Sequence, residues 1–441
     1  MSADSDLISE IDTLLQAAYQ PNAPGAAIIA VKDGQIVFRT GYGLANLELD
    51  VPIAADTVFR LASITKQFTA VAILILMEQG RLALEDPITR FWPDYPTHDQ
   101  IITVEHLLTH TSGIRSYTDM PEWPPLWRKD FSVQELIDFF KDQPMQFAPG
   151  TRWAYNNSGY HLLGAIIEHL SGQSYEQFIQ QRIFAPLGMR QSYYDHTKRI
   201  IPKRASGYQK EPDGYTNAEY LSMTQPYAAG ALASTVDDLA IWDRALSRGA
   251  LLQVATLARA WTPYRLADGT LTDYGYGWRL SAWQGHQTME HSGGIHGFAT
   301  YALRIPAEGV FVALLSNNPG ATPNELLTLK IAALLLGQPY QEPTPIVLSA
   351  QELARYVGVY RRAAGGEWIL LCENDRLFVQ EAGGPPRAIL PLSTTEFYRH
   401  DMPLDRLVFT LGTGTRVTAL EWRGRSGTPD RAERIDALIA T

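Results

Sequence analysis

The sequence predicts an α+β fold followed by a small antiparallel β-barrel, and three observations lead to this prediction. Strand patterns occur near the start of the chain, helical patterns follow, and strand patterns return near residue 300. This order indicates one sheet built from both ends of a domain, with a helical insertion. Residues 338–345 then hold three prolines, which is typical of a stiff linker. Beyond them, short strand patterns between turn residues indicate the barrel.

The elements of the first domain, predicted over 1–337, follow from hydrophobic spacing and turn signals. Residues 5–18 carry apolar side chains at helical spacing. Asp33-Gly34 separates two strand patterns and is a strong hairpin signal. A long apolar helix begins near Ser63 and ends by Gly80. The strands of the hairpin are 26–31 and 35–39, the later helices are 104–109, 133–141, 158–171 and 324–336, and the later strands are 297–305 and 310–316.

The second domain, predicted over 346–441, shows strand patterns at about the 8–12-residue spacing that is typical of small barrels and sandwiches. Its predicted strands are 356–360, 368–372, 377–380, 387–390, 396–400, 406–411 and 417–422.

Charge and composition exclude several classes of protein. The 441 residues hold 37 Lys and Arg against 47 Asp and Glu, and this net charge of −10 argues against a nucleic-acid partner. A single cysteine, Cys372, excludes an internal disulfide and a multi-cysteine zinc site. The longest apolar run, 70–77, is too short to span a bilayer. We expect no metal, no cofactor and no membrane span.

The first six residues carry neither a basic region nor an apolar one, so no signal peptide is visible. The sequence therefore predicts a cytoplasmic protein, and an exported mature form remains an alternative.

The first chemical motif is Ser63-Ile64-Thr65-Lys66, the one Ser-x-x-Lys in the chain. Residues three apart share a helical face, so Lys66 can lie beside the Ser63 hydroxyl. The helix N-terminus favours negative charge, and a serine activated by a neighbouring lysine is a nucleophile. The alternative is an N-cap serine with a solvated lysine, but the helix that follows is almost entirely apolar.

The second motif is Tyr155-Asn156-Asn157. A lysine close to Tyr155 would favour the phenolate anion, which can then act as a base. The Asn157 amide can both donate and accept hydrogen bonds. Tyr215-Thr216-Asn217 has the same spacing, but it lies in a polar stretch and no apolar helix follows it. We therefore favour Tyr155 over Tyr215.

The third motif is His291-Ser292-Gly293-Gly294, which we expect just before a strand. Glycines allow a backbone N–H to approach a substrate oxygen, and such a donor paired with the Ser63 N–H would form an oxyanion hole. A glycine-rich turn between two strands is the alternative interpretation.

In this order the three motifs resemble those of the active-site serine penicillin-recognising hydrolases. The class C β-lactamase group, which also holds D-peptidases, D-aminopeptidases and esterases, is the most similar. The resemblance covers about residues 8–337, and the tail resembles the lipocalin-like β-barrel of some of these hydrolases. The resemblance of the first domain rests also on the stretches 107–113, 147–150, 186–189 and 229–234.

The resemblance implies a role for each residue of the motifs. Ser63 is the nucleophile that becomes acylated, Lys66 helps to take its proton, and Tyr155 is the base that later protonates the leaving group. Asn157 holds the substrate amide or ester, and the N–H groups of Ser63 and Gly294 form the oxyanion hole. The family fold is an antiparallel sheet flanked by helices, with an all-helical subdomain.

The sequence departs from the β-lactamase pattern at His291, where a lysine is usual. A neutral imidazole attracts a carboxylate weakly. Recognition of a free carboxylate is therefore not expected, and the resemblance to family members with histidine here implies a serine hydrolase of small carboxylic esters, D-amino-acid amides or short D-peptides. The alternatives are a β-lactamase or D-Ala-D-Ala carboxypeptidase, and a non-catalytic scaffold with the same fold. The oligomeric state is left open.

Other residues receive structural interpretations. We expect His106 and His110 to be structural, hydrogen-bonded histidines rather than metal ligands, because no cysteine or carboxylate joins them at ligand spacing. The segment with Tyr117, Trp123 and Trp127 either lines the substrate site or forms an aromatic packed loop.

Overall fold

The computed structural model describes residues 3–319, 324–363, 365–381, 383–412, 416–425 and 429–435. The chain divides into two compact units, Met1–Pro339 and Tyr340–Thr441, and the division falls inside the predicted linker. Within the described ranges, no helix has both the length and the apolar character needed to cross a bilayer.

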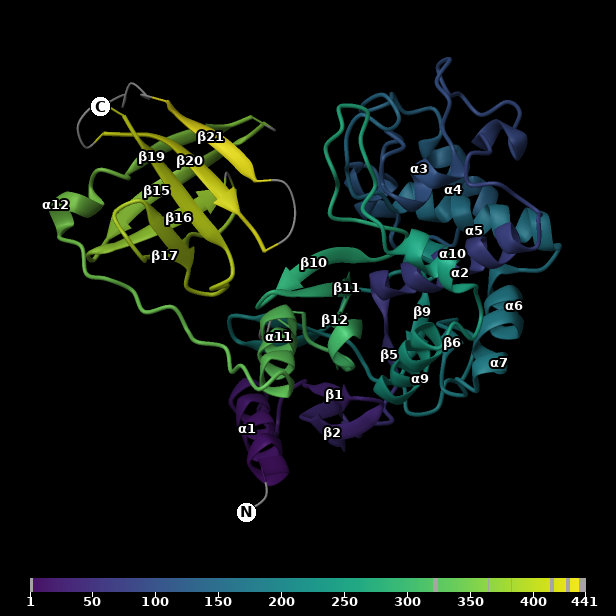
Figure 1. The fold of residues 1–441 in the computed structure, drawn as a ribbon, viewed down its shortest axis with the longest axis horizontal. Coiled ribbons are helices and arrows are strands. Elements are labelled where there is room, and N and C mark those ends of the chain that lie inside the picture. Colours follow the sequence, from purple (N-terminus) through teal and green to yellow (C-terminus); the bar gives the residue numbers. More distant parts are fainter. Residues whose placement is uncertain are drawn as a thin grey trace. The chain divides into compact units, whose positions relative to one another are not determined.

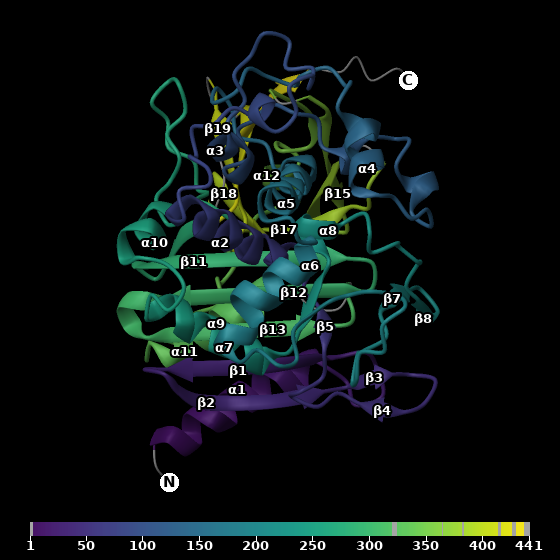
Figure 2. The ribbon, with the colours of Figure 1, turned by 90° about the vertical axis from the view of Figure 1, so that its right-hand side faces the viewer.

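The first unit is built on a six-stranded antiparallel sheet (Figures 1 and 2). The strand order is β10 (Arg279–Trp283), β11 (His286–Ile295), β12 (Phe298–Ile305), β13 (Val310–Ser316), β1 (Ala26–Lys32) and β2 (Gln35–Tyr42). As predicted, strands from both ends of the unit meet, because β1 pairs with β13 along its whole length, from Ala26 opposite Ser316 to Lys32 opposite Val310. The hairpin between β1 and β2 turns at Asp33 and Gly34, whose φ values are 51° and 75°.

Helices cover both faces of this sheet. Figure 2 shows α2 and α9 in front of the strands, and α1 and α11 lie behind them. The helices of the first unit are α1 (Ala3–Ala18), α2 (Thr65–Glu78), α3 (Val104–Leu108), α4 (Val133–Phe140), α5 (Asn157–Ser171), α6 (Tyr175–Ile179), α7 (Ala185–Leu187), α8 (Tyr227–Gly230), α9 (Val236–Ser247), α10 (Val254–Ala260) and α11 (Asn324–Leu335). Their buried side chains join those of the sheet in one large core.

Short elements complete the unit. The 3-10 turns are η1 (Ala62–Ile64), η2 (Ile88–Arg90), η3 (Tyr117–Asp119), η4 (Pro124–Leu126) and η6 (Pro306–Glu308), and η5 (Gln180–Phe184) is a π-turn. The small strands are β3 (Leu44–Asn46) with β4 (Val51–Pro52), β5 (Phe59–Arg60) with β9 (Leu232–Ser234) and β6 (Tyr193–Tyr194), and β7 (Tyr208–Glu211) with β8 (Gly214–Asn217).

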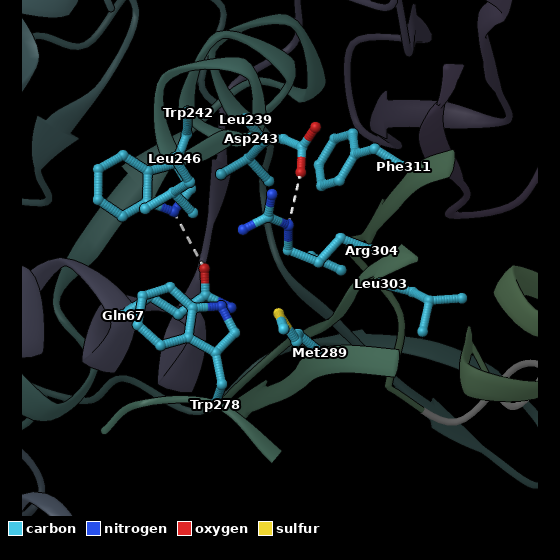
Figure 3. Close-up of a pocket in the computed structure, with 11 residues that line it drawn as sticks. Gln67, Leu239, Trp242, Asp243, Leu246, Trp278, Met289, Leu303, Arg304 and Phe311 are labelled. Carbon is cyan, nitrogen blue, oxygen red and sulfur yellow. Dashed lines mark hydrogen bonds and ion pairs between the residues drawn. The ribbon is translucent and has the colours of Figure 1, made fainter. Parts of the chain in front are cut away.

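A buried ion pair fixes α9 to the sheet (Figure 3). Nε of Arg304 on β12 lies 2.9 Å from Oδ1 of Asp243 on α9, and Arg304 also donates to Ser247 Oγ at 2.7 Å. On the same helix, Trp242 Nε1 donates to Gln67 Oε1 of α2 at 3.1 Å. Removal of one partner would leave a buried charge uncompensated. These contacts therefore hold α2, the helix that follows Ser63, in place against the sheet.

The second unit is a closed antiparallel barrel of eight strands, one more than the sequence pattern predicts. Its elements are α12 (Ala350–Leu353), β14 (Gly358–Arg362), β15 (Glu367–Glu373), β16 (Arg376–Glu381), β17 (Arg387–Pro391), β18 (Glu396–Arg399), β19 (Arg406–Leu411), β20 (Val417–Arg423) and β21 (Asp430–Ile435). Aromatic and aliphatic side chains from these strands form its core. The additional strand, β21, carries charged residues on both sides of the fully buried Ala432, so it shows no apolar alternation.

Candidate active site

Ser63 lies in the turn η1, directly before α2. The residue before it, Ala62, has a φ of 48°, a left-handed conformation that alanine rarely adopts. Gly293 of β11 packs against this turn so closely that a Cβ there would lie 2.3 Å from the Leu61 carbonyl oxygen. The turn is therefore held between the sheet and α2, with Ser63 partly exposed and Lys66 fully buried below it.

Lys66 connects the first two motifs. Its Nζ lies 3.2 Å from Ser63 Oγ, 2.8 Å from Asn157 Oδ1 and 2.9 Å from the Ala229 carbonyl oxygen. Burial lowers the pKa of the Lys66 ammonium well below its ordinary value. As an ammonium, Nζ can donate to all three oxygens. As a neutral amine it can donate to the two carbonyl oxygens and accept from the Ser63 hydroxyl, so the contacts suit both protonation states.

Tyr155 lies just before α5, with its ring 4.7 Å from Lys66 Nζ, measured to the ring centroid. Burial raises the pKa of the Tyr155 phenol well above its ordinary value, and a hydrogen bond with the Ser63 side chain offsets this only in part. The expectation that a neighbouring lysine favours the phenolate is therefore wrong for the resting site. Burial favours the protonated phenol at Tyr155 and the neutral amine at Lys66.

Asn157 is the first residue of α5, and its orientation is set from two sides. Its backbone N–H donates to Ser116 Oγ at 3.1 Å, and its Nδ2 donates to Thr118 Oγ1 at 3.1 Å. The preceding residue, Asn156, caps the helix by accepting from the Gly159 N–H at 2.7 Å. The cap and the two bonds direct the Asn157 carbonyl oxygen toward Lys66.

His291 is held by two hydrogen bonds. Its Nδ1 lies 2.6 Å from the Ser292 carbonyl oxygen, which can only accept, so Nδ1 carries the proton. Its Nε2 lies 2.7 Å from the Tyr274 hydroxyl and therefore accepts from it. Burial, with Lys66 next in effect, lowers the pKa of His291 to about 3. The imidazole is therefore neutral, and both of its nitrogens are already engaged within the protein.

The third motif lies within a strand, not just before one as the sequence suggests. Along β11 its residues alternate, so that Ser292 and Gly294 are exposed while His291 and Gly293 are buried. Gly294 lines the space beside Ser63, whereas Gly293 packs against η1. Gly293 thus serves the close approach of β11 to Ser63, and a role for it in substrate binding stays a prediction.

Two cavities meet at Ser63, and Asn157 and Gly294 line both of them. The larger, about 330 Å³, is lined also by Tyr155 and His291, and we call it the tyrosine-side cavity. The smaller, about 80 Å³, is lined mainly by apolar and aromatic side chains, and we call it the aromatic-side cavity. Its walls include Tyr117, Trp123, Leu221, Pro226 and Ile295.

The tyrosine-side cavity also contains charged groups that motif analysis missed. Arg279 of β10 and Glu290 of β11 both line it, and they lie directly opposite each other across the two strands. The charge of Arg279 also acts on Tyr155, His291 and Tyr274, since it contributes to the pKa shift of each. No motif marks Arg279 or Tyr274 in the sequence, because only the sheet brings them to Ser63.

The remaining predictions about single residues have mixed outcomes. Tyr215 lies on β8, is 37% exposed and lines neither cavity. Tyr117 and Trp123 line the aromatic-side cavity, whereas Trp127 packs against His296. Among the described residues, no group of His, Cys, Asp and Glu side chains is placed to hold a metal ion.

His110 lies directly behind Tyr155, with their ring centroids 4.5 Å apart. Its Nδ1 accepts from the Asn156 N–H at 3.1 Å, so its proton is on Nε2. That buried Nε2 has no hydrogen-bond partner among the residues that the structure describes. The expectation of a fully hydrogen-bonded His110 is therefore wrong. The ring serves as a wall for Tyr155, together with Tyr160 and Tyr274.

Comparison with known proteins identifies the family. The Beta-lactamase family model matches residues 8–336. The chain belongs to this family. It is 31% identical over 427 residues to "Penicillin-binding protein 4*" of Bacillus subtilis (strain 168), covering 91% of this chain and 93% of that protein. A D-aminopeptidase of Gluconobacter oxydans (strain 621H) is 28% identical, over 78% of this chain and 66% of its own length. Esterase EstB of Burkholderia gladioli is 33% identical over 42% of this chain and 51% of its own.

Solved structures agree with this assignment. An octameric penicillin-binding protein homologue from Pyrococcus abyssi matches 97% of this chain and 99% of its own, with a TM-score of 0.69 and 27% identity. The D-amino acid amidase from Ochrobactrum anthropi SV3 complexed with D-phenylalanine matches 76% of this chain and 98% of its own, with a TM-score of 0.65 and 28% identity. The chain is a serine hydrolase of the beta-lactamase-related family.

Proposed function

We propose that the protein hydrolyses small carboxylic esters and D-amino-acid amides or short D-peptides through an acyl-enzyme on Ser63. The contact of Lys66 Nζ with Ser63 Oγ, inside a site where burial lowers the pKa of this amine, carries the proposal. A neutral amine at hydrogen-bond distance can accept the hydroxyl proton as Oγ attacks a carbonyl carbon.

The other side chains fit the later steps of acylation. The N–H groups of Ser63 and Gly294 would bind the oxyanion that the attack forms. The oxyanion then collapses, and the bond from the carbonyl carbon to the leaving oxygen or nitrogen breaks. The leaving group takes a proton from Tyr155, which is protonated in the resting site and can be reprotonated by the Lys66 ammonium. Asn157 would align the substrate and hold Lys66 in place.

Deacylation uses the same groups in the reverse order. A water molecule loses its proton to Lys66 and attacks the acyl carbon. The bond to Ser63 Oγ then breaks, and Oγ takes a proton back from the Lys66 ammonium. Each half-reaction therefore transfers one acyl group, and at its end Lys66 and Tyr155 are in the protonation states in which they began.

The two cavities suggest where the halves of a substrate bind. Tyr155, the proposed proton donor to the leaving group, lines only the tyrosine-side cavity. We therefore place the leaving group in the tyrosine-side cavity and the acyl group in the aromatic-side cavity. The neutral, fully engaged His291 supports a leaving group that needs no carboxylate at this position. The D-aminopeptidase, amidase and esterase among the similar proteins support the same substrate classes.

A second candidate function, hydrolysis of β-lactams or D-Ala-D-Ala peptides, is favoured by Arg279. A guanidinium in the tyrosine-side cavity could bind the carboxylate of such substrates. Glu290 lies opposite Arg279 and reduces its attraction for anions, so we rank this function second. The cytoplasmic location stays a prediction.

Covalent labelling tests the proposal. We expect a fluorophosphonate to label the native chain, and we expect mass spectrometry to find the adduct on Ser63. Ser63→Ala should abolish both labelling and turnover of p-nitrophenyl acetate, by about 10⁴-fold or more. Ser9→Ala is the control, because Ser9 is exposed on α1 and lines neither cavity at Ser63, so it should leave labelling intact. An adduct on another serine, or no label at all, would overturn the proposal and favour the non-catalytic scaffold.

A further inference from the structure

A third cavity, of about 350 Å³, lies on the far side of Leu221 from Ser63. It contains two arginines, Arg60 of β5 and Arg204, together with the exposed side chains of Glu219 and Tyr220. None of these residues belongs to the three sequence motifs. We call it the arginine cavity.

The two guanidinium groups share one buried carboxylate. Arg60 Nε donates to Asp195 Oδ2 at 2.6 Å, and Arg204 Nη1 donates to Asp195 Oδ1 at 2.6 Å. Asp195 is 1% exposed, so it does not face the solvent. Two cations against one anion give the Arg60–Asp195–Arg204 cluster one net positive charge, and the exposed carboxylate of Glu219 on the same cavity offsets part of it.

Both arginines have N–H groups that are not used in the hydrogen bonds to Asp195. A guanidinium has five N–H groups, and each arginine uses one nitrogen for Asp195. The other nitrogens of Arg60 and Arg204 have no hydrogen-bond partner among the residues that the structure describes. The Arg60 guanidinium is also held over the Phe298 ring, 5.6 Å from its centroid. The cluster is therefore positioned before any ligand arrives.

The arginine cavity continues from the active site. Leu221 lines both the aromatic-side cavity and the arginine cavity. The hairpin between β11 and β12 runs in the same direction, because Gly294 and Ile295 line the aromatic-side cavity and His296 lines the arginine cavity. An acyl chain that starts at Ser63 and passes Leu221 would end near the two guanidinium groups.

We propose that the arginine cavity binds a carboxylate carried by the acyl group of the substrate, remote from the bond that is cleaved. This inference rests on the proposed function, since it takes the aromatic-side cavity as the acyl site. The ligand is a singly charged carboxylate rather than a phosphate, because the cluster has one net positive charge and Glu219 at the rim repels further negative charge. Planar guanidinium groups match carboxylate oxygens well.

The test uses p-nitrophenyl monoesters of dicarboxylic acids, from adipate to sebacate, and the same esters with the free acid capped as a methyl ester. These chains are too long for the carboxylate to attack its own ester readily. We expect kcat/KM for the acid to exceed that for its capped partner by about tenfold at one chain length, the lower end for a charge-assisted hydrogen bond. A ratio at or below one at every length would overturn the proposal.

Variants of Arg204 show whether this residue causes the preference for the free acid over the capped ester. Arg204→Gln should bring the acid-to-capped ratio to about one, and Arg204→Lys, which keeps the charge, should retain part of the preference. Arg199→Gln is the matched control, because Arg199 pairs with Glu176 and does not line the cavity. A preference that survives Arg204→Gln, or that Arg199→Gln removes equally, would overturn the proposal.

The capped esters separate the two proposals. Turnover of capped esters by the native chain without any acid preference rejects the arginine cavity and leaves the proposed function intact. Failure to turn over either ester rejects the proposed function itself. Thermal unfolding of each variant shows whether a changed ratio accompanies loss of the fold.

Discussion

Both units of the chain are built on antiparallel strands, but they differ in what the strands leave open. In the first unit, β10 pairs with β11 only up to Glu290, so residues 291–295 form an open edge beside Ser63. Polar groups from η1, α2 and α5 gather at this edge. In the second unit every strand has two neighbours, and the interior holds apolar side chains such as Phe409 and Trp368.

This difference shows where chemistry can take place. An open strand edge presents backbone donors and acceptors to a ligand, and buried polar groups near it have shifted pKa values. A closed barrel with a packed apolar core has no open strand edge and no polar groups in its interior with which a ligand could interact. We therefore assign catalysis to the first unit, and the predictions below test that assignment.

The largest expected effect concerns two tyrosines with the same local sequence pattern. Tyr155→Phe should lower kcat for p-nitrophenyl acetate by roughly 10²–10⁴-fold, because it removes the proposed proton donor. Tyr215→Phe should leave kcat unchanged, since Tyr215 is exposed on β8 and lines neither cavity at Ser63. Steady-state kinetics of both variants decide this. Similar losses in the two would show that the position of Tyr155 beside Ser63 and Lys66 does not select it for catalysis.

A smaller effect distinguishes Arg279 from His291 as the group that recognises a carboxylate. Arg279→Gln should lower the ratio of kcat/KM for nitrocefin to that for p-nitrophenyl acetate by about tenfold, because nitrocefin carries a carboxylate. The Arg279 side chain is 37% exposed, so we expect the low end of the range for a charge-assisted hydrogen bond.

His291→Gln should alter the kinetics with both substrates alike, because neutral His291 holds Tyr274 and Ser292. If His291→Gln changes the ratio and Arg279→Gln does not, His291 recognises the carboxylate after all.

The sequence predicted the parts of the site that depend on local spacing. Ser63 and Lys66 are neighbours because one helical turn separates them, and the hairpin at Asp33-Gly34 follows from turn chemistry. The predicted strands 310–316 and 26–31 pair as expected. For Ser63 with Lys66 and for the hairpin, the residues that decide the structure lie within a few positions of one another. The pairing of the two distant strands follows from the order of strand and helix patterns along the domain.

The parts that were missed depend on contacts between distant segments. Ser292-Gly293-Gly294 has the composition of a turn, yet it lies in β11 because Gly293 must pack against the Leu61 carbonyl oxygen. Lys66 in the sequence suggests a phenolate at Tyr155, but burial lowers the pKa of the Lys66 ammonium and raises the pKa of the Tyr155 phenol. Arg279 reaches the cavity only through the pairing of β10 with β11. The burial of side chains such as Lys66 and the register between strands such as β10 and β11 depend on distant segments. They therefore produce no recognisable pattern in the local sequence.

A stability measurement sharpens the description of Lys66. Lys66→Met should raise the free energy of unfolding of the first unit by about 1–3 kcal/mol at pH 7, because an apolar side chain of similar length avoids the penalty of burying the amine. Hydrogen exchange of α2 amides measures this within the full chain. Lys210→Met is the control, since Lys210 is exposed on β7.

The gain should depend on pH in a defined direction. The folded pKa of Lys66 is lowered, so between that pKa and the unfolded value of about 10.4 the unfolded state binds the additional proton. Native stability therefore rises with pH in this window, and the advantage of Lys66→Met should shrink as pH approaches 10. An advantage that is constant with pH would mean that Lys66 is protonated in the folded site.

The smallest expected effect on catalysis comes from the barrel. Phe409 is 3% exposed and packs against Tyr356 and Phe397, with ring centroids 4.8 and 5.2 Å apart. Phe409→Ala should destabilise the barrel by about 3–5 kcal/mol through loss of burial and formation of a cavity. Hydrogen exchange of β19 should report that loss, while kcat/KM for p-nitrophenyl acetate stays within twofold of native, about the 0.5 kcal/mol by which distant sites usually interact.

Thr410→Ala is the matched control, because Thr410 is the next residue of the same strand and faces outward. It should change neither barrel exchange nor turnover. If Phe409→Ala lowers turnover while Thr410→Ala does not, the barrel core influences the active site, and the assignment of catalysis to the first unit alone is wrong. If turnover survives as barrel exchange rises, the open strand edge at residues 291–295 and the side chains around Ser63 are sufficient for ester hydrolysis.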